Sequence, residues 1–113
     1  MKTITEILTL AELQQMAAGM FGNLVKAVVD IDRELIAVDA ELHADLEALL
    51  LDQGSAQKSL WGINFYPEQE GAEFIEYDSM INMRPSQGNR SRGVENEKVR
   101  KKIVEITARW IKR

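Results

Sequence analysis

Hydrophobic positions along this chain switch repeatedly between a spacing of about 3.6 residues and a spacing of two, which predicts helices interspersed with strands. Residues 2–8 alternate as a short first strand. Thr9 and Glu12 then match the T-x-x-E pattern of a capping box, which predicts that a helix begins here. The helical spacing that follows places on one face Leu10, Leu13, Met16, Ala17 and Met20.

Two alternating segments on either side of Asp32 and Arg33 predict a β-hairpin. A two-residue turn at Asp32 and Arg33 sets a register that opposes Val29 with Ile36, Ala27 with Val38, and Lys26 with Asp39. This register gives one apolar face and an opposite-charge pair on the other face. Asp-Arg is not the favoured Asn-Gly type of turn, so a longer loop is the alternative.

The second half of the chain predicts a helix, two strands and a final helix. The first of these helices begins near Asp45 and ends at Gly54. Residues 61–65 and 75–84 alternate as strands, and residues 96–112 carry a broad apolar stripe at helical spacing. The predicted order is β-α-β-β-α-β-β-α. It favours an α+β fold with two layers, a mostly antiparallel sheet and helices packed on one face, where the first and last helices cover the apolar side.

Composition fits one domain over residues 1–113, with 45% hydrophobic and 28% charged residues. The net charge of −4 argues against a partner such as duplex DNA, which needs an extended basic face. The absence of cysteine excludes disulfides and zinc–thiolate sites. The first residues lack the apolar core of a signal peptide, and no apolar run is long enough for a membrane span, so we expect a cytoplasmic protein with no membrane partner.

Three segments, ELHADLEALLLDQGS, LWGINFYPE and SMINMRPSQGNRSRGVE, resemble a family of small prokaryotic proteins known only as a domain of unknown function. The resemblance extends from about Phe21 to the C-terminal helix, and RPSQGNRSR is its most specific part. It implies a free-standing, intracellular, single-domain protein. It transfers no catalytic residue, because the family has no assigned activity.

The segment from Ser79 to Glu95 is the leading candidate for a functional site. It combines arginines, small polar residues and glycines with the N-terminus of the last helix, which are the ingredients of an anion site. We therefore predict a binding module for a small anionic ligand, phosphate- or nucleotide-like, and one exposed strand of RNA is a special case. The predicted ligand-binding residues are Arg84, Asn89, Arg90, Ser91 and Arg92. The alternative is that these arginines only pair with neighbouring acidic residues.

This loop has no apolar anchor between Met83 and Val94. Because such a segment buries little surface, we expect it to be mobile unless its polar side chains tie it down. An ordered loop would require bonds to the backbone or to carboxylates such as Glu76 or Asp78.

The predicted polar face of the sheet suggests an enzyme as a second hypothesis. Its residues are Lys26, Asp30, Asp39, Asn64, Glu76, Asp78, Asn82 and Arg84. A metal-assisted hydrolase or nuclease would use His43, Glu76 and Asp78 as metal ligands, with the arginines as clamps. Gly62 would let a ligand approach the backbone there. The simpler interpretations are a sheet face turned to water and a histidine that caps a helix.

A third hypothesis is a homodimer without catalytic activity. Val28, Leu35 and Ala37 would form an apolar patch on the otherwise polar face, and the first strand would lie at a sheet edge. Gly88 and Gly93 match neither the dinucleotide fingerprint nor the P-loop spacing. We therefore predict no cofactor.

Overall fold

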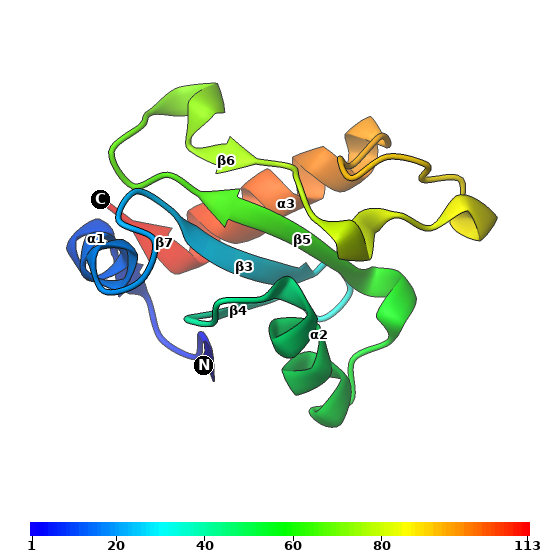
Figure 1. Cartoon of the computed structure of the whole chain (residues 1–113), viewed down its shortest axis with the longest axis horizontal. Coiled ribbons are helices and arrows are strands. Elements are labelled where there is room, and N and C mark those ends of the chain that lie inside the picture. The colour runs from blue at the N-terminus through cyan, green and yellow to red at the C-terminus, as the bar shows by residue number, and fades with distance from the viewer.

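Five antiparallel strands form the central sheet of the computed structural model, which describes residues 1–113. The strand order is β1-β4-β3-β5-β6, so β1 lies at an edge, as predicted. Figure 1 shows α3 behind this sheet and α2 below it. The predicted α+β fold with a mostly antiparallel sheet is confirmed. The elements are β1 Lys2–Thr3, β2 Leu8–Thr9, α1 Leu10–Ala18, β3 Val25–Asp30, β4 Leu35–Val38, α2 His43–Asp52, β5 Leu60–Phe65, β6 Ile75–Glu76, α3 Glu97–Trp110 and β7 Ile111–Lys112.

The β3–β4 hairpin has the predicted register, with Ala27 opposite Val38 and Val29 opposite Ile36. Its connection is the longer loop, residues 31–34, and not a two-residue turn. The Asp30 carboxylate, which is buried, organises this loop: its Oδ1 accepts hydrogen bonds at 2.9 Å from the backbone N–H groups of residues 32 and 33. A side chain that bonds to the backbone two and three residues ahead stabilises such a turn.

The predicted pair between Lys26 and Asp39 does not form. Asp39 has a φ of +72° and so leaves the strand just after Val38. Its carboxylate lies 3.6 Å from the N-terminal amine, while the ammonium of Lys26 lies over the ring of Phe21.

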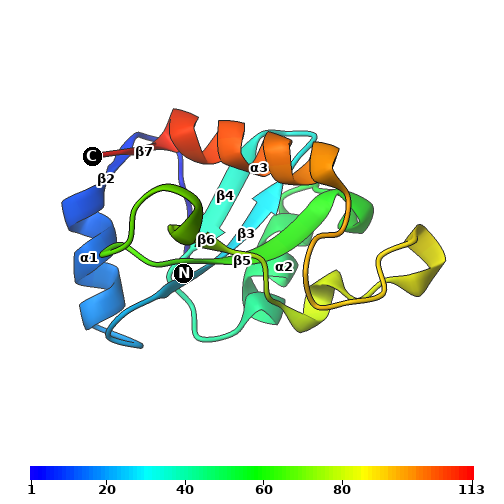
Figure 2. The same cartoon turned by 90° about the horizontal axis from the view of Figure 1, so that it is seen from above.

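One face of the sheet packs against α1 and α3, as predicted. The capping box of Thr9 and Glu12 is present at the start of α1. Seventeen buried residues form this core, among them the odd-numbered side chains of β5 and the inward side chains of both helices. Figure 2 shows α3 running along this side of the sheet. These contacts supply the main hydrophobic stabilisation of the fold.

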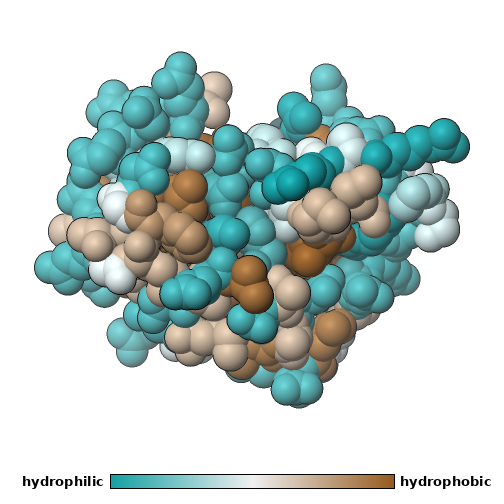
Figure 3. All heavy atoms as spheres, in the orientation of Figure 1, coloured by the Kyte–Doolittle hydropathy of each residue, from teal (hydrophilic) through white to brown (hydrophobic).

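The other face carries α2, so the prediction that all helices lie on one face needs correction. Leu46 and Leu50 of α2 pack against Val28 and Ala37 in a second, smaller core. Val28 and Ala37 are fully buried there, and are therefore not a free patch for a second copy of the chain. Val28 and Ala37 are thus where the chain's own helix packs, whereas Leu35, the third residue of the predicted patch, is partly exposed and lies outside this core. In Figure 3 the surface facing the viewer is a mixture of small hydrophobic and larger hydrophilic areas.

The predicted first strand, residues 2–8, is two separate pieces. β1 pairs with β4, and the backbone N–H of Ile4 continues this pairing to Ile36 at 2.8 Å. The chain then crosses to the end of α3, where β2 pairs in parallel with β7. The helix predicted over 96–112 accordingly ends at Trp110. No helix of the structure has the length and apolar character needed to cross a membrane.

The predicted strand over residues 75–84 is wrong beyond its first two residues. β6 ends at Glu76, and η3, a 3₁₀ turn at Met80–Asn82, takes the place of the rest. The hydroxyl of Ser79 accepts a hydrogen bond from the N–H of Ile81, which favours this turn. Local side-chain bonds of this kind compete with strand pairing. The alternation of apolar residues in 75–84 therefore did not reflect a continuous strand.

Candidate functional site

The arginine loop, which we define as residues 84–93, protrudes at the end of the molecule opposite α1 (Figures 1 and 2). Two backbone hydrogen bonds close its first part, because Arg84 and Asn89 pair as an antiparallel bridge with N–O distances of 2.7 and 3.1 Å. The turn between them, η4, spans Pro85–Gln87 and ends at Gly88 with a φ of +83°. A left-handed residue at this position favours glycine.

Asn89 holds the second part of the loop together. The side chain is 4% exposed, and its amide nitrogen donates to the carbonyl oxygens of Asn82, Ser91 and Gly93 at 2.7 to 3.1 Å. Its oxygen accepts from the N–H of Glu95 at 2.9 Å. Asn89 was predicted to contact a ligand, but its amide is fully occupied by the backbone of its own loop. Of the two alternatives for this loop, the structure has the one in which polar side chains tie it to the backbone.

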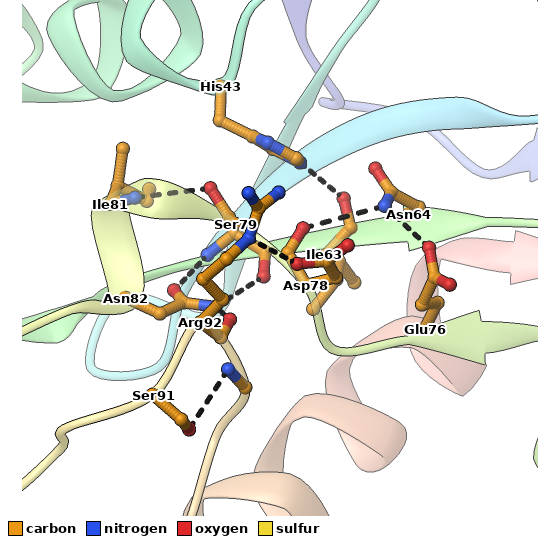
Figure 4. A network of polar contacts seen from close by, with 12 residues as sticks. His43, Ile63, Asn64, Glu76, Asp78, Ser79, Ile81, Asn82, Ser91 and Arg92 are labelled. Atoms are coloured by element: carbon orange, nitrogen blue, oxygen red, sulfur yellow. Dashed lines mark hydrogen bonds and ion pairs between the residues drawn. The ribbon is translucent and has the colours of Figure 1, made fainter.

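Asn82 connects the loop to the sheet (Figure 4). β6 covers only the last residues of β5, which leaves the N–H and C=O of Gly62 without a strand partner. The Asn82 amide replaces that partner: it accepts from the Gly62 N–H at 2.8 Å and donates to the Gly62 C=O at 2.9 Å. It also donates to the carbonyl of Arg92 at 2.9 Å. One buried side chain therefore satisfies the sheet edge and fixes the position of Arg92.

The space next to Gly62 is filled by another segment of the chain and is not open to a ligand. A Cβ added to this glycine would lie 2.5 Å from the Cβ of Ser79. A close approach to the backbone of Gly62 is thus present, but the group that approaches is the segment leading into η3. The suggestion that a ligand uses this gap is wrong.

Arg84 also bonds to the backbone. Its guanidinium donates to the carbonyl oxygens of Ile81, Gln57 and Leu60, and its Cζ lies 4.3 Å from the centre of the Trp61 ring. These bonds use the donors that a ligand would need. Arg84 therefore holds the start of the loop against β5, as Asn82 does next to it.

Arg92 brings the loop into contact with the polar face of the sheet. Its Nε donates to Oδ1 of Asp78 at 2.7 Å, and both side chains are about half exposed. Figure 4 shows the remaining guanidinium nitrogens of Arg92 on the side of His43. Arg90, by contrast, forms no side-chain hydrogen bond and none of the ion pairs in the structure. Arg90 is therefore the cationic side chain of the loop without a partner, while Arg92 is paired with Asp78 and keeps further N–H donors unused.

Glu95 was not identified as a site residue from the sequence, yet it occupies the anion site of the loop backbone. Its Oε2 accepts hydrogen bonds from the consecutive N–H groups of Arg90 and Ser91 at 2.7 and 2.8 Å. These two bonds hold the pKa of Glu95 below its ordinary value. The only signal in the sequence was its place between the glycine-containing loop and the helix. Two adjacent N–H groups are thus available to an anion at this turn, and the carboxylate that accepts their hydrogen bonds belongs to the chain itself.

The N-terminus of α3 is capped by the chain as well. The Asn96 side chain accepts from the N–H of Lys98 at 2.8 Å and of Val99 at 3.3 Å. These are donors that would otherwise be free for an anion. The helix therefore contributes its dipole to the neighbourhood of Glu95, but its first-turn N–H groups are not all open.

The alternative metal site at His43, Glu76 and Asp78 is not assembled. No group of three or more His, Asp or Glu side chains in the structure is placed to hold a metal ion. His43 Nε2 lies 2.8 Å from the carbonyl oxygen of Ile63, and burial lowers the pKa of the imidazole, which is therefore neutral at pH 7. Asn64 donates to Glu76 at 2.8 Å, and Asp78 pairs with Arg92. The polar face is a hydrogen-bonded network and not a set of free ligands.

Comparison with known proteins gives a family but no function. Neither the curated proteins nor the solved structures include a match to this chain. One family model does match, over residues 2–110, and it is described as a protein of unknown function, DUF5674. The match covers nearly the whole chain and confirms the resemblance to a family of unknown function. The chain belongs to the DUF5674 family.

Proposed function

We propose that this protein binds a small anionic ligand, bearing a phosphate or carboxylate group, at the turn formed by Arg90, Ser91 and Arg92. The observation that carries the proposal is the position of Glu95. Its carboxylate accepts hydrogen bonds from two consecutive backbone N–H groups of this turn. Adjacent N–H groups that converge on one oxygen are a common way to bind an anion. The turn therefore has the backbone geometry of an anion site and already holds one anionic group.

The side chains around this turn suit an external anion. The Arg90 guanidinium has no partner in the structure, and Arg92 uses only its Nε. A guanidinium pairs two oxygens of a phosphate or carboxylate at once, and such charged bonds are about twice as strong as neutral ones. Ser91 adds a hydroxyl whose oxygen accepts from the N–H of Gly93 at 3.1 Å and which also hydrogen-bonds to the carboxylate of Glu95, the group that an external anion would replace.

The backbone of the turn is held in place by the chain itself. Asn82 fixes the carbonyl of Arg92, and Asn89 fixes those of Ser91 and Gly93. Ordering a residue costs about 1–2 kcal/mol in backbone entropy. Because the fold supplies these bonds, an anion would not have to order the loop when it binds. Arg84 and Asn89 thus belong to the proposed site as groups that hold it, while Arg90, Ser91 and Arg92 contact the ligand.

A titration with inorganic phosphate and with AMP, followed by backbone amide shifts, tests the proposal. Wild-type protein should show saturable shifts at residues 90–95. The double variant Arg90→Gln/Arg92→Gln should bind at least about tenfold more weakly, since it loses both charged donors. Glu95→Ala should bind about tenfold more tightly, since it frees two N–H groups and removes a competing charge.

Two exposed residues of α3 give charge-matched controls. Lys101→Gln removes one positive charge and Glu97→Ala removes one negative charge, and neither side chain takes part in an ion pair. Both should behave as wild type. The proposal fails if the arginine double variant keeps the wild-type response, or if Glu95→Ala and Glu97→Ala change the affinity equally.

A further inference from the structure

A groove lies between the second half of α3 and the segment that precedes and forms β6. Its volume is about 570 Å³. η2, a 3₁₀ turn at Gly71–Glu73, forms one wall, and Figure 2 shows this turn beside α3. The apolar lining includes Phe74, Ile75, Val104 and Ile111. Cavities of about 300–1,000 Å³ with mostly apolar walls are typical of sites for small molecules.

The charged residues that line this groove are all positive. They are Arg100, Lys112 and Arg113, and no aspartate or glutamate lines it. The chain as a whole has a net charge of −4. A cleft whose walls carry one sign of charge concentrates ions of the opposite sign. The groove is therefore a local positive region on an acidic protein.

These cations are held by aromatic rings and carbonyl oxygens and not by carboxylates. The Cζ of Arg100 lies 4.9 Å from the centre of the Tyr77 ring, and that of Arg113 lies 5.3 Å from the centre of the Phe74 ring. The ammonium of Lys112 donates to the carbonyl of Ala108 at 2.6 Å. None of the three takes part in an ion pair. Cation–π contacts fix a charge in place but leave it uncompensated.

Thr107 provides an independent observation. It lines the groove, is 5% exposed, and its hydroxyl has no hydrogen-bond partner. A buried hydroxyl without a partner is unfavourable. The oxygen is covered by neighbouring atoms, so a polar atom of a ligand in the groove would provide the missing partner after a change in the Thr107 side-chain conformation.

We infer that this groove binds a small amphipathic acid, a molecule with an unbranched apolar body and one carboxylate. The apolar body would lie along α3, where the rise from Arg100 to Ala108 is about 12 Å at 1.5 Å per residue. The carboxylate would lie against the basic groups of the rim. This site shares no residue with the arginine loop. Its test is therefore independent of the test of the proposed anion site.

Titration of the full chain with decanoate, below the concentration at which it forms micelles, tests this inference. Amide shifts should saturate at residues 104–108 and 74–77. Decanol, which has the same body without the charge, should bind about tenfold more weakly. Equal binding of decanoate and decanol, or no saturable shift with decanoate, would overturn the inference.

Two variants locate the binding. Ala108→Phe fills the groove from an exposed position of α3, and Arg100→Gln removes one rim charge. Each should weaken decanoate binding by about tenfold or more. The matched controls are Ala48→Phe on the exposed side of α2 and Lys101→Gln next to Arg100, and both should bind as wild type. All four variants should keep the response to phosphate. Wild-type affinity for decanoate in Ala108→Phe would place the ligand elsewhere and refute the site.

Discussion

Replacing Asn82 by alanine is expected to lower the free energy of unfolding by about 3 kcal/mol. The side chain is fully buried and makes three hydrogen bonds, two of them to the N–H and C=O of Gly62. Alanine leaves these two backbone groups buried without a partner, and each such group costs about 1–3 kcal/mol. Since small domains are stable by only about 5–15 kcal/mol, denaturant unfolding should show the loss clearly.

Asn96→Ala is the matched control for this prediction. Asn96 makes two hydrogen bonds of the same kind, as the cap of α3, but it is exposed to water. Loss of a helix cap costs about 1 kcal/mol. If Asn82→Ala cost no more than Asn96→Ala, the Asn82 amide would not be the partner that completes the edge of β5.

Gly62→Ala is expected to destabilise the protein by about 3 kcal/mol as well. The added Cβ would lie 2.5 Å from the Cβ of Ser79 and 3.1 Å from Cγ1 of Ile81. Overpacking of this kind costs about 1–3 kcal/mol, and here the neighbouring atoms are held by η3. Thermal or denaturant unfolding measures the effect.

A double-mutant cycle with Ser79→Gly separates this clash from any general cost of altering β5. In the Ser79→Gly background, Gly62→Ala should cost less than half as much as in the wild type. Gly19→Ala serves as a neutral reference, because the nearest atom to its added Cβ is 3.5 Å away and its φ of −78° suits alanine. Equal costs for Gly62→Ala in the two backgrounds would contradict the close packing of β5 on η3.

The parts of the fold that the sequence predicted correctly are those in which neighbouring residues decide the structure. The hairpin register follows from the alternation around Val29 and Ile36, and the start of α1 follows from the capping box at Thr9. The wrong predictions concern features that are determined by contacts between residues distant in the sequence. The polar face was expected to stay open because nothing in the pattern of α2 shows that Leu46 and Leu50 would cover Val28. Periodicity does not identify which face of a sheet a helix will choose.

That the arginine loop binds a ligand stays a prediction, while the structure changes the roles of several of its residues. The sequence singled out the arginine loop by its arginines, small polar residues and glycines next to the last helix. It did not distinguish a guanidinium that binds carbonyl oxygens, as Arg84 does, from one that stays free, as Arg90 does. The difference depends on β5, which is distant in sequence from the loop. The role of Asn82 was missed for the same reason, since it appeared to belong to a strand.

We expect the fold itself to hold the turn carrying Arg90 and Arg92 in place before any ligand binds. Amide hydrogen exchange of the ligand-free wild-type protein tests it most directly. The N–H groups of Asn89 and Glu95, bonded to Arg84 and to the Asn89 side chain, should exchange slowly. The N–H of Asn23, which donates no hydrogen bond, is the internal reference for fast exchange. Exchange at residues 87–91 and 95, whose N–H groups all donate hydrogen bonds, as fast as at Asn23 would show that the fold does not hold this turn in place.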